Sequence, residues 1–462
     1  MIRNQDIRNN PDRFGYLLQP TEHRYQVYYS KYKRMPGVIH DMTRGVNSKF
    51  WLHLKDVDLL VKSNRGPYDG IGEVLCYKTC EQVGYGHRCV NARQVTIIKR
   101  ETDDKKYPEG MSYDDGVVLP SYLRREWREA RTISGKSLIN ERADYIYENQ
   151  YGQKVSRDHT LSNYLETLRW YRETKYFGDD VEIYNNIERR LKFMCLLDYM
   201  TCQSDRHWEN LEFILVTDQN GKRHLKLAKY YDNSHVFGLH RGPDKITSLA
   251  QNIRTLQNCD PERDARKIQK ITDLIKGNYE TVPMFGIITP TYKSEIKQFP
   301  DGAEECISLS KDKAKLDIFV TELAQMLLQD PELMRDYQRL RQVDYAQMLT
   351  DNFDQRDVPE DLKVVLPYIA SKRVEMLDQA LLQCQSQVED GELVVSDTIH
   401  IPQTEGRLTP DEYEEMMREQ RSLISFTFGM QEDAEDGAPP TDGVEDPNKK
   451  KAQEDDGQGG QK

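Results

Sequence analysis

Residues 198–238 read DYMTCQSDRHWENLEFILVTDQNGKRHLKLAKYYDNSHVFG and contain the polar side chains that decide this fold. Asp205 and Asn210 stand five positions apart in a polar segment, and Asp232 follows a run of alternating apolar residues. A long apolar pattern with helical spacing precedes the segment, and a short strand pattern follows Asn210. The sequence therefore predicts a helix, a polar loop, a hairpin and a second acidic loop, in that order.

This order meets the demands of phosphoryl transfer. In protein kinases, an Asp that faces the acceptor hydroxyl and an Asn that binds magnesium stand five positions apart on one loop, and a second metal-binding Asp follows a later strand. Asp205 is accordingly the candidate catalytic base, and Asn210 and Asp232 are the candidate magnesium ligands. Alone, Asp-x-x-x-x-Asn occurs by chance in most proteins of this size and Tyr-Asp-Asn-Ser is more often a turn, so the prediction depends on their combination. His207, in the same loop, is expected to support Asp205 or to pack beneath it.

A lysine and a glutamate upstream complete the pattern. Lys62 ends the apolar strand Val57–Val61, where a kinase places the lysine that contacts the nucleotide phosphates. Residues 72–83 have helical spacing, and Glu73 shares a face with apolar residues, so its carboxylate points inward and needs a cation. We expect Lys62 to be that cation. Glu81 is the competing carboxylate, but it lies on a more polar stripe.

The segment MTRGVNSKFW, residues 42–51, precedes the first strand of the N-terminal hairpin. Its Gly45, Ser48 and Lys49 are candidates for contacts to the nucleotide phosphates, because a loop with glycine and small polar residues can turn backbone N–H groups toward an anion. A single glycine is a weaker signal than a full glycine-rich motif.

Composition limits the class of protein. The chain has 462 residues, of which 31% are charged, and a mean hydropathy of −0.80. No apolar run approaches the ~20 residues of a membrane span and no secretory signal is evident, so a cytoplasmic location is expected. The net charge of −12 argues against nucleic-acid binding through the overall field. The eight cysteines lack a C-x-x-C pair, and Cys76 and Cys80 lie within an apolar pattern, which indicates buried thiols rather than a disulfide or zinc framework.

The predicted fold class is α+β, with a small β-rich lobe followed by a larger, mostly helical lobe. The hairpin spans the alternating residues 50–54 and 57–61, a further strand spans 90–99, and 117–127 leads into helical structure. A long connection is expected at 278–310. Further helices are expected at 261–277, 311–328, 332–349 and 361–385. The predicted divisions are an N-terminal extension (1–38), a small lobe (39–118), a helical lobe (119–385), a C-terminal extension (386–430) and a disordered acidic tail (431–462).

With these residues the chain resembles the HipA-like serine/threonine kinases, including the CtkA-type bacterial members, over about residues 40–385. That family has a D-x-x-x-x-N-x-D-R-H-x-x-N segment and a later Y-D, which are similar to residues 198–210 and 231–232. Its nucleotide loop is similar to TRGVNSKFW, and its lysine strand to LLVK. The resemblance implies a bilobal, protein-kinase-like fold that uses ATP and Mg²⁺ to transfer phosphate to serine or threonine of a protein, often to itself. One departure is Gln203, where the family often has Asn.

Two other functions stay open at this stage. A phosphoinositide or small-molecule kinase would use the same loops, although the chain lacks the dense basic cluster that a membrane-facing site needs. A non-catalytic nucleotide-binding scaffold would keep the fold without the reaction. The acidic tail is interpreted as a solvating extension in preference to a segment that contacts a basic partner.

Overall fold

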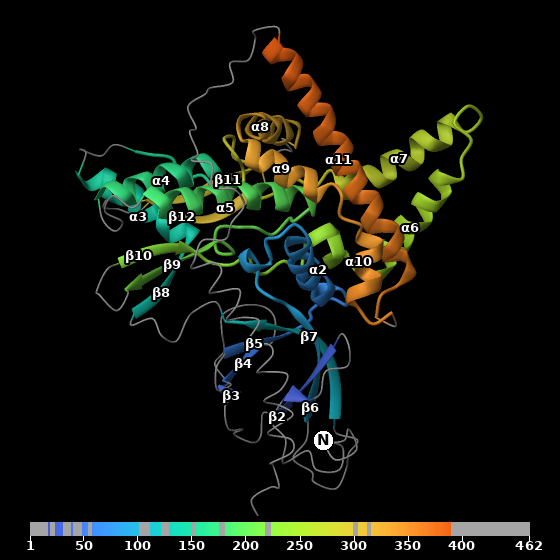
Figure 1. Ribbon diagram of the computed structural model, residues 1–462, viewed down its shortest axis with the longest axis horizontal. Helices are drawn as coiled ribbons and strands as arrows, with labels where there is room; N and C mark the ends of the chain where they lie inside the picture. The colour runs from blue at the N-terminus through green and yellow to red at the C-terminus, as the bar shows by residue number, and fades with distance from the viewer. Residues whose placement is uncertain are drawn as a thin grey trace, which may run out of the picture.

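The computed structural model gives the arrangement of most of the chain (Figure 1). The structure describes residues 17–18, 24–30, 38–39, 49–53, 58–100, 111–121, 129–149, 154–174, 181–217, 223–298, 304–311, 316–355 and 357–389. Gly45, Ser48 and the acidic tail lie outside these residues, as does the C-terminal extension beyond residue 389.

The first part of the chain forms a seven-stranded mixed sheet with the order β1-β2-β6-β7-β5-β4-β3. The strands are β1 (Leu17–Leu18), β2 (Arg24–Ser30), β3 (Val38–Ile39), β4 (Lys49–His53), β5 (Asp58–Ser63), β6 (Arg93–Arg100) and β7 (Met111–Pro120). The predicted hairpin is confirmed, because β4 and β5 pair antiparallel with Lys49 opposite Lys62. β2 pairs in parallel with β6, so this part of the N-terminal segment belongs to the sheet.

Helix α2 (Asp69–Gln82) confirms the predicted helix and lies between the sheet and the helical part of the molecule (Figure 1). The Asp69 carboxylate accepts hydrogen bonds from the backbone N–H groups of Arg65 and Gly66 at 2.9 Å, which fixes the turn before the helix. The chain leaves α2 through Gly84, whose φ of +90° favours glycine. Eleven of the fourteen residues of α2 are buried, which makes it a central element despite its place early in the chain.

A second, three-stranded antiparallel sheet carries the loops of interest. Its order is β10-β9-β8, with β8 at Glu129–Ser134, β9 at Glu212–Thr217 and β10 at Arg223–Leu227. Helix α5 (Val181–Met200) runs into the loop before β9, as the sequence predicts. The chain leaves β10 through residues 228–235 and continues into the 3₁₀ segment η3 (Val236–Arg241).

The remaining elements are mostly helices. They are α3 (Gly135–Asn149), α4 (Leu161–Thr174), α6 (Pro243–Gln257), α7 (Ala265–Tyr279), α8 (Leu316–Gln329), α9 (Pro331–Leu340), α10 (Tyr345–Asn352) and α11 (Glu360–Glu389). One cluster of buried apolar residues includes Leu75 of α2, Val117 of β7, Leu196 of α5 and Leu366 of α11. The hydrophobic core therefore connects α2 and the first sheet with the helices.

Three predictions about elements need correction. The segment 117–127 is expected to lead into helical structure, but β7 extends to Pro120 and the next described element is the strand β8. The predicted connection 278–310 contains the antiparallel strands β11 (Tyr292–Gln298) and β12 (Glu304–Lys311). The single helix predicted at 332–349 is divided into α9 and α10. Strands β11 and β12 are not evident from the sequence because both are polar. They are defined by their pairing with each other and not by a continuous apolar face.

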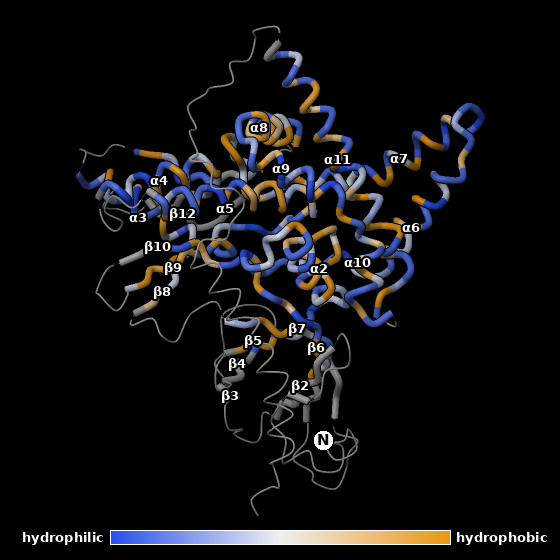
Figure 2. Tube along the Cα trace, in the orientation of Figure 1, coloured by the Kyte–Doolittle hydropathy of each residue, from blue (hydrophilic) through white to orange (hydrophobic). Residues whose placement is uncertain are grey.

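Hydrophobic residues are interspersed with hydrophilic ones along the helices (Figure 2). Among the described residues, no helix combines the length and the apolar character that crossing a membrane requires.

Candidate active site

The loop between α5 and β9 holds Asp205, His207 and Asn210, and a buried arginine anchors it. Arg206 is fully buried, and its Nε and Nη2 donate to the two carboxylate oxygens of Asp198 at 3.0 and 3.1 Å. Burial alone would lower the pKa of Arg206, but the Asp198 carboxylate outweighs it and raises that pKa. Burial raises the pKa of Asp198, and Arg206 opposes that shift. The pair joins the end of α5 to the middle of the loop.

The same guanidinium reaches the second acidic loop. Nη1 of Arg206 donates to the carbonyl oxygen of Tyr231 at 2.7 Å, and Nη2 donates to Oδ1 of Asn233 at 2.6 Å. These two residues flank Asp232. One buried side chain thus fixes the loop that contains Asp205 relative to the loop that contains Asp232.

Gln203 is the second bridge between the two loops. Its Oε1 accepts from the backbone N–H of Asp205 at 3.1 Å, and its Nε2 donates to the carbonyl oxygen of Asp232 at 3.3 Å. The Gln203 side chain is fully buried, and both contacts are partly buried. The residue that departs from the family pattern therefore has a defined role here, which is to connect the backbones of Asp205 and Asp232.

Asn210 is held with its amide group in a fixed orientation. Its Nδ2 donates to the carbonyl oxygen of Asp205 at 2.8 Å, and its backbone N–H donates to the carbonyl oxygen of His207 at the same distance. Among the described residues, Oδ1 of Asn210 has no hydrogen-bond partner. A carbonyl oxygen of this kind suits a hard divalent cation such as Mg²⁺.

Lys62, Glu73 and Asp232 form the charged centre of the site. Nζ of Lys62 lies 3.0 Å from Oε1 of Glu73 and also pairs with Oδ1 of Asp232. Burial would lower the pKa of Lys62, but the two carboxylates outweigh it and raise that pKa. Burial would likewise raise the pKa of Asp232, and Lys62 holds it below its usual range. Lys62 and Asp232 are therefore charged, and Lys62 contacts Glu73 as expected.

Glu73 also fixes the backbone after Asp232. Its Oε2 accepts from the backbone N–H of Asn233 at 2.8 Å, while Asp232 adopts a φ of +55° that is uncommon for a residue with a side chain. This turn passes close to α2, since a Cβ on Gly72 would lie 2.8 Å from the carbonyl oxygen of Ser234. Glycine at position 72 therefore allows Glu73 to reach the turn.

Lys49 lies in the site, but on a strand rather than in a loop. It is the first residue of β4 and stands opposite Lys62. Burial and the like charge of Lys62 lower the pKa of Lys49, while Asp232 and Glu73 oppose this shift. The site thus has two ammonium groups next to two carboxylates. Gly45 and Ser48, the other candidates from this segment, lie outside the described residues.

The histidines differ from expectation. His207 accepts a hydrogen bond from the backbone N–H of Glu209 at 3.2 Å, and no hydrogen bond joins it to Asp205 in the described structure. His207 therefore shapes the turn of the loop. The residue beneath the loop is His159, which is fully buried and lies 2.7 Å from the carbonyl oxygen of Arg206. Burial lowers the pKa of His159 to about 3, so its neutral ring donates from Nε2.

His235 is the histidine beside the candidate base, and the sequence interpretation did not include it. Its Nδ1 lies 3.8 Å from Oδ2 of Asp205, and its ring stacks on His240 with centroids 4.3 Å apart. Both side chains of the pair are about one third exposed, at 35% for His235 and 33% for Asp205. In the sequence, its position three residues after Asp232 is the feature that indicates proximity to the site.

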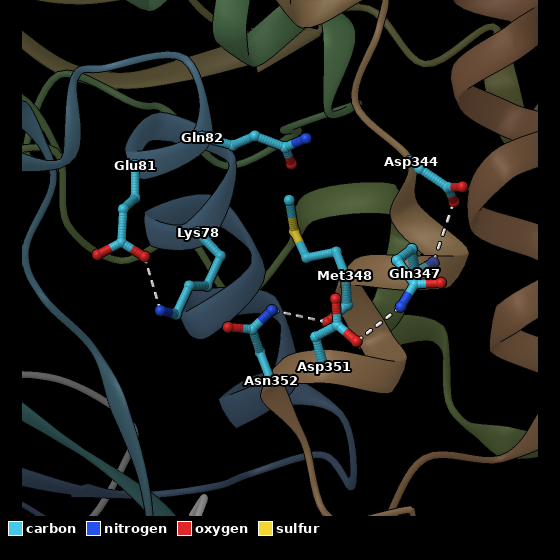
Figure 3. A pocket seen from close by; sticks show the side chains of 8 residues that line it. All are labelled: Lys78, Glu81, Gln82, Asp344, Gln347, Met348, Asp351 and Asn352. Carbon is cyan, nitrogen blue, oxygen red and sulfur yellow. Dashed lines mark hydrogen bonds and ion pairs between the residues drawn. The ribbon is translucent and has the colours of Figure 1, made fainter.

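A separate pocket of about 230 Å³ lies between α2 and α10 (Figure 3). Its polar side chains pair mainly among themselves, with Lys78 bonded to Glu81 and Gln347 bonded to Asp351. The pocket contains none of the predicted site residues. Glu81, the competing carboxylate, belongs to this surface and not to the Lys62 centre.

Similar proteins are found by comparison of structures and not by comparison of sequences. No protein-family model matches the chain, and no curated protein matches it in sequence. The crystal structure of the proinflammatory kinase CtkA of Helicobacter pylori is similar over 78% of this chain and 98% of that chain, with a TM-score of 0.42 and 15% identity. The HipA, HipB and operator DNA complex of the Shewanella oneidensis MR-1 toxin–antitoxin system is similar over 76% of this chain and 68% of that chain, with a TM-score of 0.31 and 10% identity. CtkA and HipA are the kinds of protein that the motifs resemble.

Proposed function

We propose that the protein is an ATP- and Mg²⁺-dependent protein serine/threonine kinase of the HipA-like type, with a bilobal kinase arrangement. The observation that carries this proposal is the convergence of three distant segments on one charged centre. Lys62 of β5 contacts Glu73 of α2 and Asp232, and Gln203 connects Asp232 with Asp205. Phosphoryl transfer depends on these side-chain types in this relation.

Asp205 is the proposed base that receives the proton of the acceptor hydroxyl. Its backbone is fixed by Gln203 and Asn210, whereas its carboxylate is one third exposed and open to an incoming hydroxyl. His235, 3.8 Å away, is placed to stabilise the carboxylate or to exchange a proton with it. A general base of this kind contributes about 10²–10⁴-fold to a rate.

Asn210 and Asp232 are the proposed Mg²⁺ ligands. The donor set fits the cation, because it consists of an amide oxygen without a hydrogen-bond partner in the described structure and a carboxylate that is about one third exposed. When bound, Mg²⁺ would neutralise charge on the ATP phosphates. Lys62 and Lys49 are the proposed phosphate contacts, and Glu73 holds Lys62 in place.

Intact mass spectrometry after incubation with ATP and Mg²⁺ tests the proposal. We expect the wild type to gain about 80 Da for each phosphoryl group transferred to itself. Folded Asp205→Ala protein should show at least about 100-fold slower gain, because it lacks the base. Glu209→Ala is the matched control, since Glu209 lies exposed in the same loop and its hydrogen bonds to His207 and Tyr231 use its backbone N–H and carbonyl oxygen, which alanine keeps.

Two outcomes would contradict the proposal. One is a wild type that neither gains mass nor forms ADP in the presence of serine- and threonine-containing proteins. The other is a folded Asp205→Ala protein that transfers phosphate at the wild-type rate. ADP formation that depends on phosphoinositide vesicles, without phosphorylated protein, would instead identify a lipid kinase.

A further inference from the structure

Three cysteines that the proposed reaction does not use meet in the interior, next to the charged centre. The sulfur atoms of Cys76, Cys80 and Cys89 all lie within 4.8 Å of one another. Each residue is at most 1% exposed, and all three are free thiols. The sequence pattern correctly indicates that Cys76 and Cys80 are buried, but it gives no sign that Cys89 joins them.

The backbone brings the three sulfurs together in two ways. Cys76 and Cys80 are four residues apart on α2, so both side chains lie on one face of that helix. Gly84 then reverses the chain, and the short 3₁₀ turn η1 (Gly86–Arg88) precedes Cys89. Hydrogen bonds from Tyr230 N–H to Arg88 and from Val90 N–H to Tyr230 fix this segment. The two sources of sulfur are thus held by rigid structure.

A buried cation next to this cluster makes no ion pair with a described residue, although Asp336 lies near enough for its charge to act on it. Arg88 is 3% exposed, and its Nε and Nη1 have no hydrogen-bond partner in the described structure. Its guanidinium lies 3.6 Å from the centre of the Tyr85 ring, and no carboxylate of a described residue is within 4.0 Å of it. A buried positive charge without a partner is costly. Negative charge on the neighbouring sulfurs would offset this cost.

An amide near the cluster also favours negative sulfur. Nδ2 of Asn233 donates to Sγ of Cys89 at 3.7 Å. Burial raises the pKa of Cys80 and Cys89, so without a cation the thiols stay protonated. In that state the Cys89 thiol reaches the carbonyl oxygen of Tyr230 at 3.4 Å. A bound metal ion would displace the protons, because a coordinating thiol loses its proton.

We propose that Cys76, Cys80 and Cys89 form a three-sulfur site for a soft monovalent cation, Cu(I). Thiolates select soft ions, and no imidazole or carboxylate among the described residues completes a four-ligand zinc set with the three sulfurs. Binding replaces S–H protons, which leave to solvent. Three thiolates with Cu(I) carry a charge of −2, and −1 if one sulfur keeps its proton; Arg88 offsets one negative charge.

This site would tie three segments together. Cys76 and Cys80 lie on the helix that carries Glu73, while Cys89 pairs with the residues before Asp232 through Tyr230. A bound cation would therefore stabilise the contact between α2 and the turn at Asp232. The proposal does not depend on phosphoryl transfer, because metal retention and thermal stability can be measured without ATP.

The test uses the full-length protein under anaerobic conditions, with Cu(I) supplied in the presence of a competing Cu(I) chelator. We expect the wild type to retain one equivalent and to unfold at a higher temperature than the metal-free protein. Cys80→Ala should retain at least tenfold less Cu(I). Cys195→Ala is the matched control, since Cys195 is equally buried but does not belong to the cluster, and it should retain Cu(I) as the wild type does.

X-ray absorption of the loaded wild type gives a second readout that does not require a folded variant, and it should show copper bound by sulfur alone. The proposal is overturned if the wild type loses Cu(I) to the chelator as readily as Cys80→Ala does. It is also overturned if Cys195→Ala loses the metal equally, or if the absorption spectrum shows nitrogen or oxygen ligands.

Discussion

At the scale of single residues, the buried Arg206–Asp198 pair determines whether the candidate site can form. Arg206 makes contacts to Asp198, Tyr231 and Asn233 that a lysine could not reproduce, because only a guanidinium presents its donors as a planar fork. Each contact connects a different part of the site. A buried ion pair of this kind adds little net stability. Loss of one partner is strongly destabilising, however, because the other charge is then buried without a partner.

We predict that Asp198→Ala lowers the free energy of unfolding by about 3–5 kcal/mol, because it leaves the Arg206 charge buried without a partner. Glu375→Ala is the control, since Glu375 pairs with Lys372 at 2.6 Å but both side chains are partly exposed, at 50% and 30%. The control should lose no more than about 1 kcal/mol. Urea unfolding of both variants measures the difference, and equal losses would show that the buried pair has no special role.

The sequence alone predicted the residues whose spacing is local. Asp205 and Asn210 share one loop, and Glu73 stands out as a carboxylate on an apolar helix face. His235 and His159 were missed because their positions near the loop depend on how distant segments pack. Lys49 was expected in a loop, and only strand pairing shows that it stands opposite Lys62.

At the scale of elements, the approach of α2 to the turn at Asp232 depends on Gly72. Alanine is a better helix former than glycine by about 1 kcal/mol. At position 72, however, its Cβ would lie 2.8 Å from Ser234 O and 3.1 Å from Asn233 O, both of which are backbone atoms that cannot move independently. The steric effect should exceed the gain in helix propensity.

We predict that Gly72→Ala lowers the free energy of unfolding by about 1–3 kcal/mol, as overpacking in a core does. The matched change is Gly277→Ala on α7, where a Cβ would meet no atom within 4 Å in the described structure. That variant should be more stable by about 0.4–1 kcal/mol. Chemical unfolding of both proteins decides the matter, and stabilisation by Gly72→Ala would show that α2 does not need this close approach.

Elements with strong periodicity were predicted, and elements defined by pairing were not. The β4–β5 hairpin, α2 and α5 follow directly from their apolar spacing. Strands β11 and β12 have polar sequences, so nothing in either one alone indicates its partner. Helix α6 was not predicted, although Ile246, Leu249, Ala250 and Ile253 have helical spacing and are buried. The spacing of α6 is visible in the sequence, whereas the pairing of β11 with β12 is visible only in the three-dimensional structure.

At the scale of the whole molecule, the first part of the chain and the helices are joined by polar contacts as well as by the core. Tyr85, just after α2, donates from its hydroxyl to Oδ1 of Asp336 on α9 at 2.9 Å. The groups that act on Asp336 are Tyr85, Arg88, Arg339 and Glu332. Burial is the dominant effect, and it raises the pKa of Asp336 to about 6.

This raised pKa links the stability of the whole molecule to pH. In the unfolded chain Asp336 has an ordinary pKa near 4, so between about pH 4 and pH 6 the folded state holds the proton more tightly. The contribution of Asp336 to stability is therefore complete below the unfolded pKa and decreases as pH rises through the folded value. Near neutral pH the buried carboxylate is charged, and the cost of its burial lowers the stability of the fold even though the Tyr85 hydroxyl donates to the charged form.

We predict that the wild type loses about 2–3 kcal/mol of stability relative to Asp336→Asn between pH 4 and pH 7, because the amide cannot ionise. Urea unfolding of both proteins at several pH values measures the difference, in which the titrations of all other groups largely cancel. A constant offset between the two proteins would mean only that a hydrogen bond to Tyr85 has changed. If the wild type instead gains stability relative to Asp336→Asn as pH rises, the predicted direction is wrong. That result would show that Arg88 and Arg339 stabilise the Asp336 carboxylate.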